Sequence, residues 1–350
     1  MSGAGTGPEG VRPVEARDQL DRDSLQRWLD AAVPGAGPVH GLYAFNGGNS
    51  NPTFLLVTAA GELVLRRKPI GNLLPSAHAV DREFRVMAAL RQTDVPVPRV
   101  HALCEDDAVL GAAFYVMDRV PGRVIWDLSL PGFEPGERAA LYTDQIDTIA
   151  RLHAVDPNAI GLADYGRSGN YNERQISRWV RQYRASAGQT IDSMEALIDA
   201  LSAAIPASNA AVIVHGDLRL DNMVIAERTP AVAALLDWEL STIGNPDADF
   251  AYYLMHWDLP AGERSSLGGH NLAALGIPSC DEALQRYTGT SGRAIPDIAW
   301  YIAYNMFRLA AIRAGMAARV RAGTASNERM ASAAASIPKL ARRALDLLGG

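Results

Sequence analysis

The chain has 350 residues, 48% of them hydrophobic and 21% charged, which supplies a sizeable core and excludes a disordered chain. Its 33 basic and 39 acidic residues give a formal charge of −6, which argues against nucleic acids or anionic membranes as partners. Two distant cysteines exclude a disulfide framework, and the sequence shows neither a signal peptide nor an apolar run long enough to cross a membrane. We therefore expect a cytoplasmic protein.

The first third of the chain is predicted to be rich in strands. Residues 1–16 contain many Gly and Pro residues and are expected to form a disordered tail, after which a helix is predicted over residues 18–32. Apolar runs, apolar periodicity and Gly or Pro breaks predict the next elements: strands at 54–57 and 63–65 joined by a hairpin turn at 59–61, a helix at 77–91, and strands at 99–104 and 113–117.

After a Pro-Gly break at residues 121–122, the chain is predicted to be mostly helical. Apolar residues recur with a helical period over residues 137–154, 172–187, 194–205, 249–256, 281–287, 295–322 and 327–348. Two short apolar runs, at 211–214 and 232–236, are typical of buried strands. This order predicts an α+β fold in two segregated lobes, an N-terminal lobe of residues 17–118 and a helical lobe of residues 119–350.

The most specific motif lies at residues 215–222, which read HGDLRLDN and follow the first of those buried strands. In the catalytic loop of protein kinases, H-R-D-L-x-x-x-N, an Asp and an Asn have the same separation as Asp217 and Asn222 here. A second acid, Asp237, follows the next predicted strand, as the metal-binding Asp does in kinases. The combined pattern predicts a phosphoryl-transfer site.

Each residue type in this pattern has a chemical reason. Phosphoryl transfer needs positioning and charge neutralisation, so Asp217 is expected to accept the proton of the substrate hydroxyl. Mg²⁺ prefers hard oxygen ligands, which Asn222 and Asp237 supply. Arg219 lies where protein kinases usually have a Lys that contacts the transferring phosphate, and a guanidinium can make that contact with two donors. Glu239 is either a second metal ligand or a surface acid.

The nucleotide half of the site is predicted in the first third of the chain. Protein kinases have a Lys at the end of a V-A-I-K strand, and Arg66 takes that position in Leu-Val-Leu-Arg. Lys68 shares the same strand face and is a second candidate for phosphate contact. Glu83, in the following helix, matches the Glu that pairs with the strand cation, although Asp81 competes for that role.

Two further segments are candidates for nucleotide contact. The loop that contains Asn49 and Ser50 has two glycines and small polar residues, so its backbone N–H groups are able to approach phosphates; an ordinary polar turn is the alternative. Asp118 and Val120 follow the last strand of the first lobe, where kinase-like folds bind adenine through backbone groups.

Some polar and aromatic residues are expected to be structural. Asp249 follows Gly-Asn-Pro and is expected to tie its loop to its helix, and His153 is expected to pack within a helix. Aromatic residues between Trp300 and Phe307 recur along one helix and are expected in the core.

Together these motifs resemble the aminoglycoside phosphotransferase-like family, within the APH/choline kinase superfamily. The likeness rests on residues 47–52 (GGNSNP), 65–69 (LRRKP), 75–78 (PSAH) and 215–222 (HGDLRLDN). It is strongest for the branch that occurs as a kinase-like domain fused to acyl-CoA dehydrogenases. The resemblance implies a bilobal protein-kinase-like fold, ATP and Mg²⁺ as cofactors, and transfer of phosphate to a small-molecule alcohol.

Charge gives one clue to the acceptor. Residues 281–350 contain ten basic residues and five acidic ones, and in the family the C-terminal helices help to wall the acceptor site. A polycationic aminoglycoside prefers an acidic wall, so we expect a neutral or anionic hydroxylated acceptor, such as a hydroxy acid or a hydroxyacyl-CoA. Arg308, beside the aromatic stripe, is the first candidate for contact with it.

Other classes of function remain as alternatives. A metallophosphoesterase also needs a D-x-H motif upstream and an N-H-D motif downstream, and the sequence has neither. An aminoglycoside O-phosphotransferase is the nearest alternative, and a nucleotide-binding pseudokinase or scaffold is suggested by Arg66 in place of Lys. The sequence leaves open the acceptor, the choice of ATP over GTP, and the oligomeric state.

Overall fold

The structure, a computed structural model, describes residues 10–46, 51–71, 79–167, 169–186, 188–208, 210–263, 265–322 and 334–349. It divides into two compact units. Unit 1 comprises the described residues up to Gly122 together with Ala233–Glu239. Unit 2 comprises Arg123–Val232 and the described residues from Leu240 onward. Unit 1 therefore includes a short segment, with Asp237, that comes from much later in the sequence.

Unit 1 is built on one six-stranded antiparallel sheet with the order β1-β2-β3-β4-β6-β5. The strands are β1 (Val11–Pro13), β2 (Val39–Phe45), β3 (Thr53–Thr58), β4 (Gly61–Arg67), β5 (Val100–Cys104) and β6 (Phe114–Asp118). The helices are α1 (Arg22–Ala32), α2 (Val80–Leu90) and the short α3 (Asp107–Leu110). This sheet, with the mainly helical unit 2 described below, confirms the α+β fold expected from the sequence.

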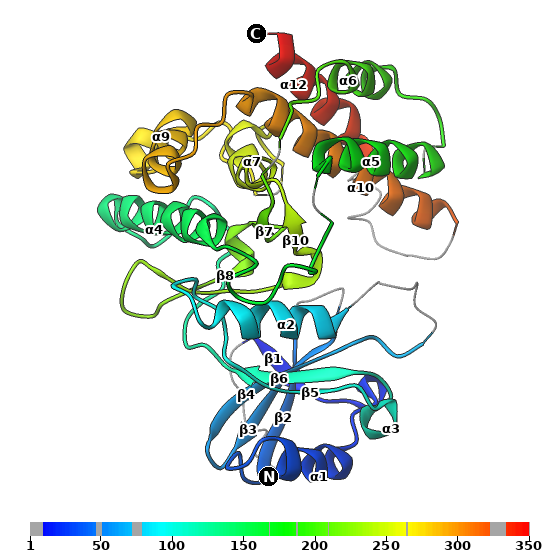
Figure 1. Cartoon of the computed structure of the whole chain (residues 1–350), viewed down its shortest axis with the longest axis vertical. Coiled ribbons are helices and arrows are strands. Elements are labelled where there is room, and N and C mark those ends of the chain that lie inside the picture. Colours follow the sequence, from blue (N-terminus) through cyan, green and yellow to red (C-terminus); the bar gives the residue numbers. More distant parts are fainter. Residues whose placement is uncertain are drawn as a thin grey trace, which may run out of the picture. The chain divides into compact units, whose positions relative to one another are not determined.

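Alternation along β4 decides which side chains meet which helix, because successive residues of a strand point to opposite faces. One face of the sheet packs its leucines against Leu25 and Leu29 of α1, and α2 covers the other face (Figure 1). Arg67 points to the α1 side, where its guanidinium lies 5.5 Å from the Phe54 ring centroid and donates to the Leu110 carbonyl at 3.1 Å. Arg66, one residue earlier, therefore points toward α2.

The expected tail of residues 1–16 needs correction. Val11–Pro13 forms edge strand β1, which pairs with β2 through Val11 opposite Phe45. Arg12 reinforces this edge with two contacts of 2.7 Å to the Asp18 carboxylate. A segment of three residues that ends in Pro is too short to show an alternation of apolar and polar residues. This strand therefore forms because it pairs with β2, not because of its local sequence. Strand β2 was also not predicted, and its register shifts at Gly41.

Unit 2 is mainly helical. Its helices are α4 (Pro135–Ala154), α5 (Tyr171–Ser186), α6 (Asp192–Ala203), α7 (Pro246–Asp258), α8 (Leu272–Leu275), α9 (Cys280–Ser291), α10 (Ile298–Arg321) and α12 (Ile337–Gly349). Strands β7 (Val212–Val214) and β10 (Thr242–Gly244) form a two-stranded antiparallel sheet. The short strands β8 (Met223–Ile225) and β9 (Val232–Leu235) follow the catalytic-loop motif, and β9 continues into unit 1.

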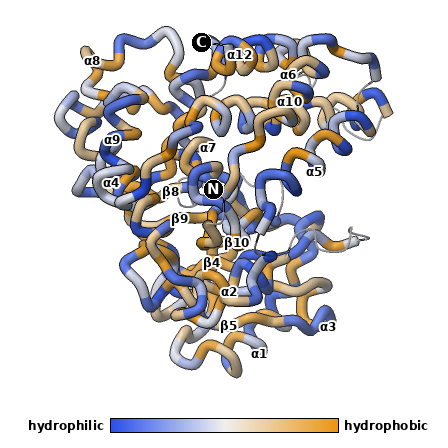
Figure 2. The backbone as a smooth tube through the Cα atoms, turned by 45° about the horizontal axis from the view of Figure 1, so that its top comes forward, coloured by the Kyte–Doolittle hydropathy of each residue, from blue (hydrophilic) through white to orange (hydrophobic). Residues whose placement is uncertain are grey.

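Helix α10 is the central element of unit 2, since it packs against α5, α6, α7 and α12. It is buried along most of its first three turns, including Trp300, Tyr301, Tyr304 and Phe307, so the aromatic stripe is core as expected. The tube of α10 is accordingly mostly apolar in Figure 2, whereas α5 alternates polar and apolar stretches.

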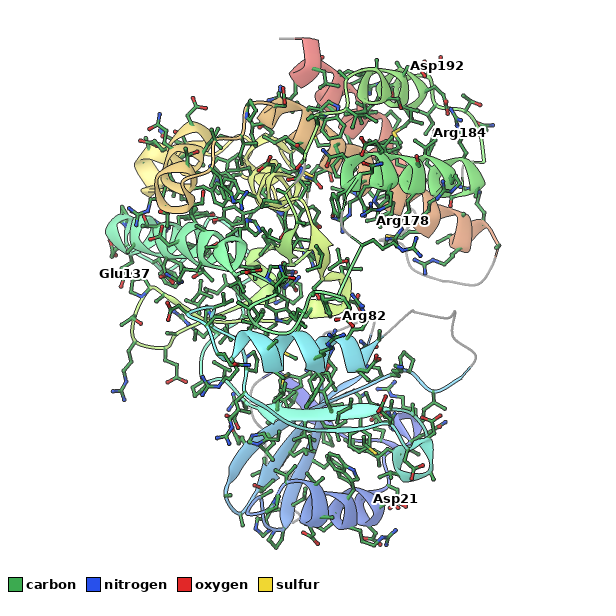
Figure 3. All side chains as sticks on the ribbon, viewed as in Figure 1. Asp21, Arg82, Glu137, Arg178, Arg184 and Asp192 are labelled. Carbon is green, nitrogen blue, oxygen red and sulfur yellow. The ribbon has the colours of Figure 1, made fainter. Side chains whose placement is uncertain are left out.

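Charged residues occupy the outer faces of other helices of unit 2. Glu137 of α4, Arg184 of α5 and Asp192 of α6 are exposed (Figure 3), and Arg184 pairs with Glu195 at 2.9 Å. Among the helices that the structure describes, none combines the length and the apolar character that a membrane crossing needs.

Candidate active site

In unit 1, Arg66 bridges two carboxylates. Its Nε lies 2.8 Å from Oε2 of Glu83, and its Nη2 lies 2.5 Å from Oδ1 of Asp237. Glu83 comes from α2, on the face of the sheet to which the alternation of β4 directs Arg66. The planar guanidinium of Arg has donors on several sides, so one Arg can contact both acids. The ammonium group of a Lys is a compact charge without this planar set of donors. The pairing of Glu83 with the strand cation is as the spacing predicted.

Glu83 is almost completely buried and both of its oxygens are bonded. Asn51 donates to Oε1 at 2.7 Å, and Tyr115 donates to Oε2 at 3.0 Å. Burial raises the pKa of Glu83, and the positive charge of Arg66 opposes that shift. Burial alone would lower the pKa of Arg66, but Glu83 and Asp237 more than offset it, so Arg66 is firmly charged.

Asn51 is a site residue that sequence reasoning did not single out. It is fully buried at the end of the polar loop that was expected near phosphates, and it fixes that end of the loop to Glu83. Asn49 and Ser50, the residues predicted to contact the nucleotide, lie outside the described residues.

Three other predicted nucleotide-binding residues lie at the ends of strands in unit 1. Lys68 follows β4, and its Nζ lies 3.6 Å from Oδ1 of Asp81, so Asp81 pairs with Lys68 and leaves Glu83 to Arg66. Asp118 ends β6, where its backbone N–H donates to the Arg99 carbonyl at 2.8 Å. Val120 follows two residues later and is half-buried.

In unit 2, the HGD sequence makes a sharp turn after β7. Gly216 has φ of +83°, and a Cβ at this position would lie 2.7 Å from the backbone oxygen of Leu240. Only glycine adopts this conformation in this space without strain. The backbone N–H groups of His215 and Gly216 donate to the buried Asp249 carboxylate at 2.7 and 2.8 Å. Asp249 thus ties the HGD loop to α7, whereas the sequence predicted that it would tie the Gly-Asn-Pro loop before α7 to that helix.

Asp217, the predicted base, is held through both carboxylate oxygens. Tyr252 donates to Oδ1 at 2.6 Å and Asn222 Nδ2 donates to Oδ2 at 2.9 Å. Arg219 Nε lies 3.4 Å from Oδ1. Burial alone would raise the pKa of Asp217, but Arg219 and the Tyr252 hydroxyl lower it, and the net shift is downward. At neutral pH Asp217 is a carboxylate, the form that can accept a proton.

The predicted metal ligands offer the oxygen donors that Mg²⁺ prefers. Asn222 turns Nδ2 toward Asp217, donating also to its backbone carbonyl at 2.8 Å, and so keeps its amide oxygen for another partner. Asp237 has φ of +65°, a left-handed conformation that is uncommon for residues with a Cβ and that Asp adopts more readily than most. Asn222 belongs to unit 2 and Asp237 to unit 1. The described residues contain no group of three or more His, Cys, Asp and Glu side chains arranged to hold a metal.

Two residues behind the loop complete its support. His153 is buried in α4, with Nε2 3.2 Å from Oδ2 of Asp249 and Nδ1 2.7 Å from the Tyr287 hydroxyl, so it is a packed histidine, as expected. Arg308 of α10 donates to the Gly216 carbonyl at 2.6 Å, and its guanidinium carbon lies 4.9 Å from the Tyr252 ring centroid. Arg308 therefore supports the loop directly.

Part of the surplus of basic residues after position 281 is paired with acids that lie outside that stretch. Three of those arginines pair with acids that lie earlier in the chain: Arg286 with Asp147 at 2.5 Å, Arg313 with Glu263 at 2.7 Å, and Arg343 with Asp258 at 2.5 Å. Counting charges along one stretch of sequence missed these partners. The argument for acceptor charge therefore rests on the arginines beside Asp217 rather than on the surplus.

The family model described as "phosphotransferase enzyme family" (APH) matches residues 42–295, which include both clusters. The chain therefore belongs to this family, and the family resemblance seen in the motifs is confirmed. It is also similar to mouse acyl-CoA dehydrogenase family member 10, with 41% identity over 328 residues, covering 92% of this chain and 30% of the mouse protein. The chain spans 30–45% of the length of the curated relatives it matches.

Solved structures agree with the fold. A candidate aminoglycoside phosphotransferase from Ralstonia eutropha is 44% identical, with a TM-score of 0.87 over 94% of this chain and 98% of that chain. A thermostable mutant of aminoglycoside phosphotransferase APH(4)-Ia, in ternary complex with AMP-PNP and hygromycin B, is 13% identical, with a TM-score of 0.60 over 93% and 98% of the two chains. The second likeness concerns the fold alone.

Proposed function

We propose that the chain is a cytoplasmic ATP-dependent kinase that transfers the γ-phosphate of ATP to a hydroxyl group of a neutral or anionic small molecule. One observation carries this proposal: Asp217 is an ionised carboxylate with both oxygens held by hydrogen bonds, in a family of phosphotransferases. A base that is charged and fixed before the substrate arrives suits general base catalysis.

In the proposed reaction, the acceptor hydroxyl donates a hydrogen bond to Asp217. As the hydroxyl oxygen forms its bond to the γ-phosphorus, the bond from that phosphorus to the β–γ bridging oxygen breaks. The hydroxyl proton passes to Asp217 and ADP leaves with the bond's electron pair. Arg219, which lies between Asp217 and Asp221, is the chain's candidate for stabilising the phosphoryl oxygens.

We propose Asn222 and Asp237 as the residues that hold Mg²⁺, which would neutralise the phosphate charge when bound with ATP. Arg66 Nη2 lies 2.5 Å from one oxygen of Asp237. We also propose Arg66, Lys68, Glu83, Asn49 and Ser50 for the phosphate side of the nucleotide, and the backbone groups of Asp118 and Val120 for adenine.

A neutral or anionic acceptor is favoured by the charges near the base. Arg219 and Arg308 both lower the pKa of Asp217 through their positive charge, and an approaching polycation would meet that charge. The names of the curated relatives connect this family branch with acyl-CoA chemistry, which favours a hydroxyacyl-CoA or a hydroxy acid among the candidates.

Two alternatives remain open to test. The name of the Ralstonia eutropha structure, at 44% identity, favours an aminoglycoside O-phosphotransferase. The Arg66–Asp237 ion pair favours a pseudokinase or scaffold, since it occupies a predicted metal ligand.

The test is a mass-spectrometric screen of the purified chain with Mg²⁺ and ATP. The acceptor panel contains hydroxy acids, hydroxyacyl-CoAs and an aminoglycoside, and the Asp217→Asn variant is the control. A phosphorylated hydroxy acid or CoA ester that depends on Asp217 supports the proposal. Preferred phosphorylation of the aminoglycoside supports the first alternative. Nucleotide binding without transfer to any acceptor, measured by thermal shift with and without Mg²⁺, supports the second.

A further inference from the structure

We propose that Tyr252 is a positioning residue that fixes the Asp217 carboxylate for transfer, and that Arg308 holds Tyr252 and the loop backbone from the other side. This inference rests on the function proposed above. It assigns a role to a side chain that lies outside the motif at residues 215–222.

Tyr252 reaches Asp217 because of its place on α7. It lies three residues after Asp249, so the two side chains share one face of the helix, and both contact the loop. Asp249 holds the backbone of residues 215 and 216, whereas the Tyr252 hydroxyl donates to Oδ1 of Asp217 at 2.6 Å. Tyr252 is only 6% exposed, so water does not readily replace this bond.

The Tyr252 bond is not the only contact at this oxygen. Arg219 Nε lies 3.4 Å from Oδ1 of Asp217, and its Nη2 lies 3.2 Å from Oδ2 of Asp221. The carboxylate torsion of Asp is broad and roughly two-fold, which means that one bond alone does not fix it. Asn222 holds Oδ2 and Tyr252 holds Oδ1, and only together do they define the carboxylate plane.

Arg308 supports Tyr252 through its ring rather than through its hydroxyl. The guanidinium lies between two aromatic rings, 4.9 Å from the centroid of Tyr252 and 5.5 Å from that of Trp179 on α5. Arg178, labelled on α5 in Figure 3, lies 5.3 Å from the same Trp179 ring. Arg308 also donates to the Gly216 carbonyl at 2.6 Å. Through Arg308, side chains of α5, α7 and α10 are therefore linked to Gly216, the residue before Asp217.

The neighbouring Tyr253 provides a matched control. It lies on the same helix, is 2% exposed, and donates its hydroxyl to Oε1 of Gln145 at 3.1 Å. Tyr253→Phe therefore removes a buried tyrosine hydroxyl and its hydrogen bond, as Tyr252→Phe does. The difference is that the Tyr253 hydroxyl bonds a neutral amide, which lies far in sequence from the motif at residues 215–222. Tyr252→Phe keeps the ring that Arg308 contacts.

The first test is a double-mutant unfolding cycle, which needs no acceptor. In urea unfolding, Tyr252→Phe should raise the unfolding equilibrium constant about tenfold or more, since it removes a hydrogen bond to a charged group. The same change should have a much smaller effect in the Asp217→Asn background, where that charge is absent. Equal effects in both backgrounds would overturn the proposal. Tyr253→Phe should act equally in both.

The second test separates positioning from mere stability. With an acceptor identified by the screen, Tyr252→Phe should lower kcat about ten- to a hundredfold while KM for ATP stays within about twofold, because only the fixed geometry of the base is lost. Tyr253→Phe should keep kcat. Equal kcat values for the two variants would overturn the role. Absence of transfer by the unaltered chain would refute the proposed function. The unfolding cycle would then still test whether the Tyr252 hydroxyl bonds the charged Asp217 carboxylate.

Discussion

Replacing Gly216 by Ala should damage the catalytic loop, and the structure sets the size of the effect. A left-handed backbone costs a residue with a Cβ about 1–2 kcal/mol relative to glycine, and φ here is +83°. The new Cβ would lie 2.7 Å from the backbone oxygen of Leu240 and 3.1 Å from its Cβ, so the loop or Leu240 must shift. Such overpacking typically costs a further 1–3 kcal/mol or so. We expect a total destabilisation of about 2–5 kcal/mol.

The shift should also reach the chemistry, because the residues that bond the loop backbone cannot follow it. The Gly216 N–H donates to Asp249 and its carbonyl accepts from Arg308, so a displaced Gly216 strains both bonds next to Asp217. We therefore expect kcat to fall about a hundredfold, the size of loss that a misplacement of about 1 Å can produce.

The assay is thermal unfolding together with steady-state kinetics, and Gly289→Ala is its control. Gly289 lies within α9, and a Cβ added there would have no neighbouring atom within 4 Å, so alanine should be neutral or stabilising by up to about 1 kcal/mol. Gly216→Ala should lower Tm by about 4–20 °C, since each kcal/mol shifts the Tm of a unit of this size by about 2–4 °C. An unchanged Tm and kcat for Gly216→Ala would refute this reading of the turn.

Two further substitutions test the charged groups of the site. Asp237→Asn should weaken Mg²⁺-dependent nucleotide binding, because it removes a hard anionic ligand. The metal role would be contradicted if the unaltered chain bound ATP equally well with EDTA and with Mg²⁺. Arg308→Met should raise KM for an anionic acceptor more than KM for ATP and should also lower kcat, since the Gly216 carbonyl loses its donor. Arg286→Met, which breaks an exposed pair with Asp147, should change neither constant, and an effect as large as that of Arg308→Met would contradict the argument.

Local pattern was sufficient for the parts of the site that the backbone itself organises. The strand alternation directed Arg66 and Arg67 to opposite faces, and the helical spacing offered Glu83 to Arg66. Asp249 was expected to be structural from its place after a Gly-Asn-Pro turn, but its two backbone bonds hold the HGD loop rather than that turn. The alternation of β4 and the spacing along α2 were enough to predict the pairing of Arg66 with Glu83.

The residues that sequence reasoning missed depend on tertiary contacts. Tyr252 meets Asp217 only because α7 packs under the loop, and Asn51 meets Glu83 only because α2 covers the sheet. Strand β1 forms through pairing with β2 rather than through any pattern of its own. The sequence count also missed that part of the basic surplus is paired, since Arg286 contacts an acid 139 residues earlier in the chain.

The central claim is that Asp217 is the base of a phosphoryl transfer, and single-turnover phosphorylation of the identified acceptor by Asp217→Asn measures it most directly. The substitution keeps the size of the side chain and its capacity to accept the Tyr252 hydrogen bond, but it removes the group that takes the proton. We expect the rate of transfer to fall about 10²–10⁴-fold while Mg·ATP affinity stays close to that of the unaltered chain. A transfer rate within about threefold of that of the unaltered chain would contradict the account.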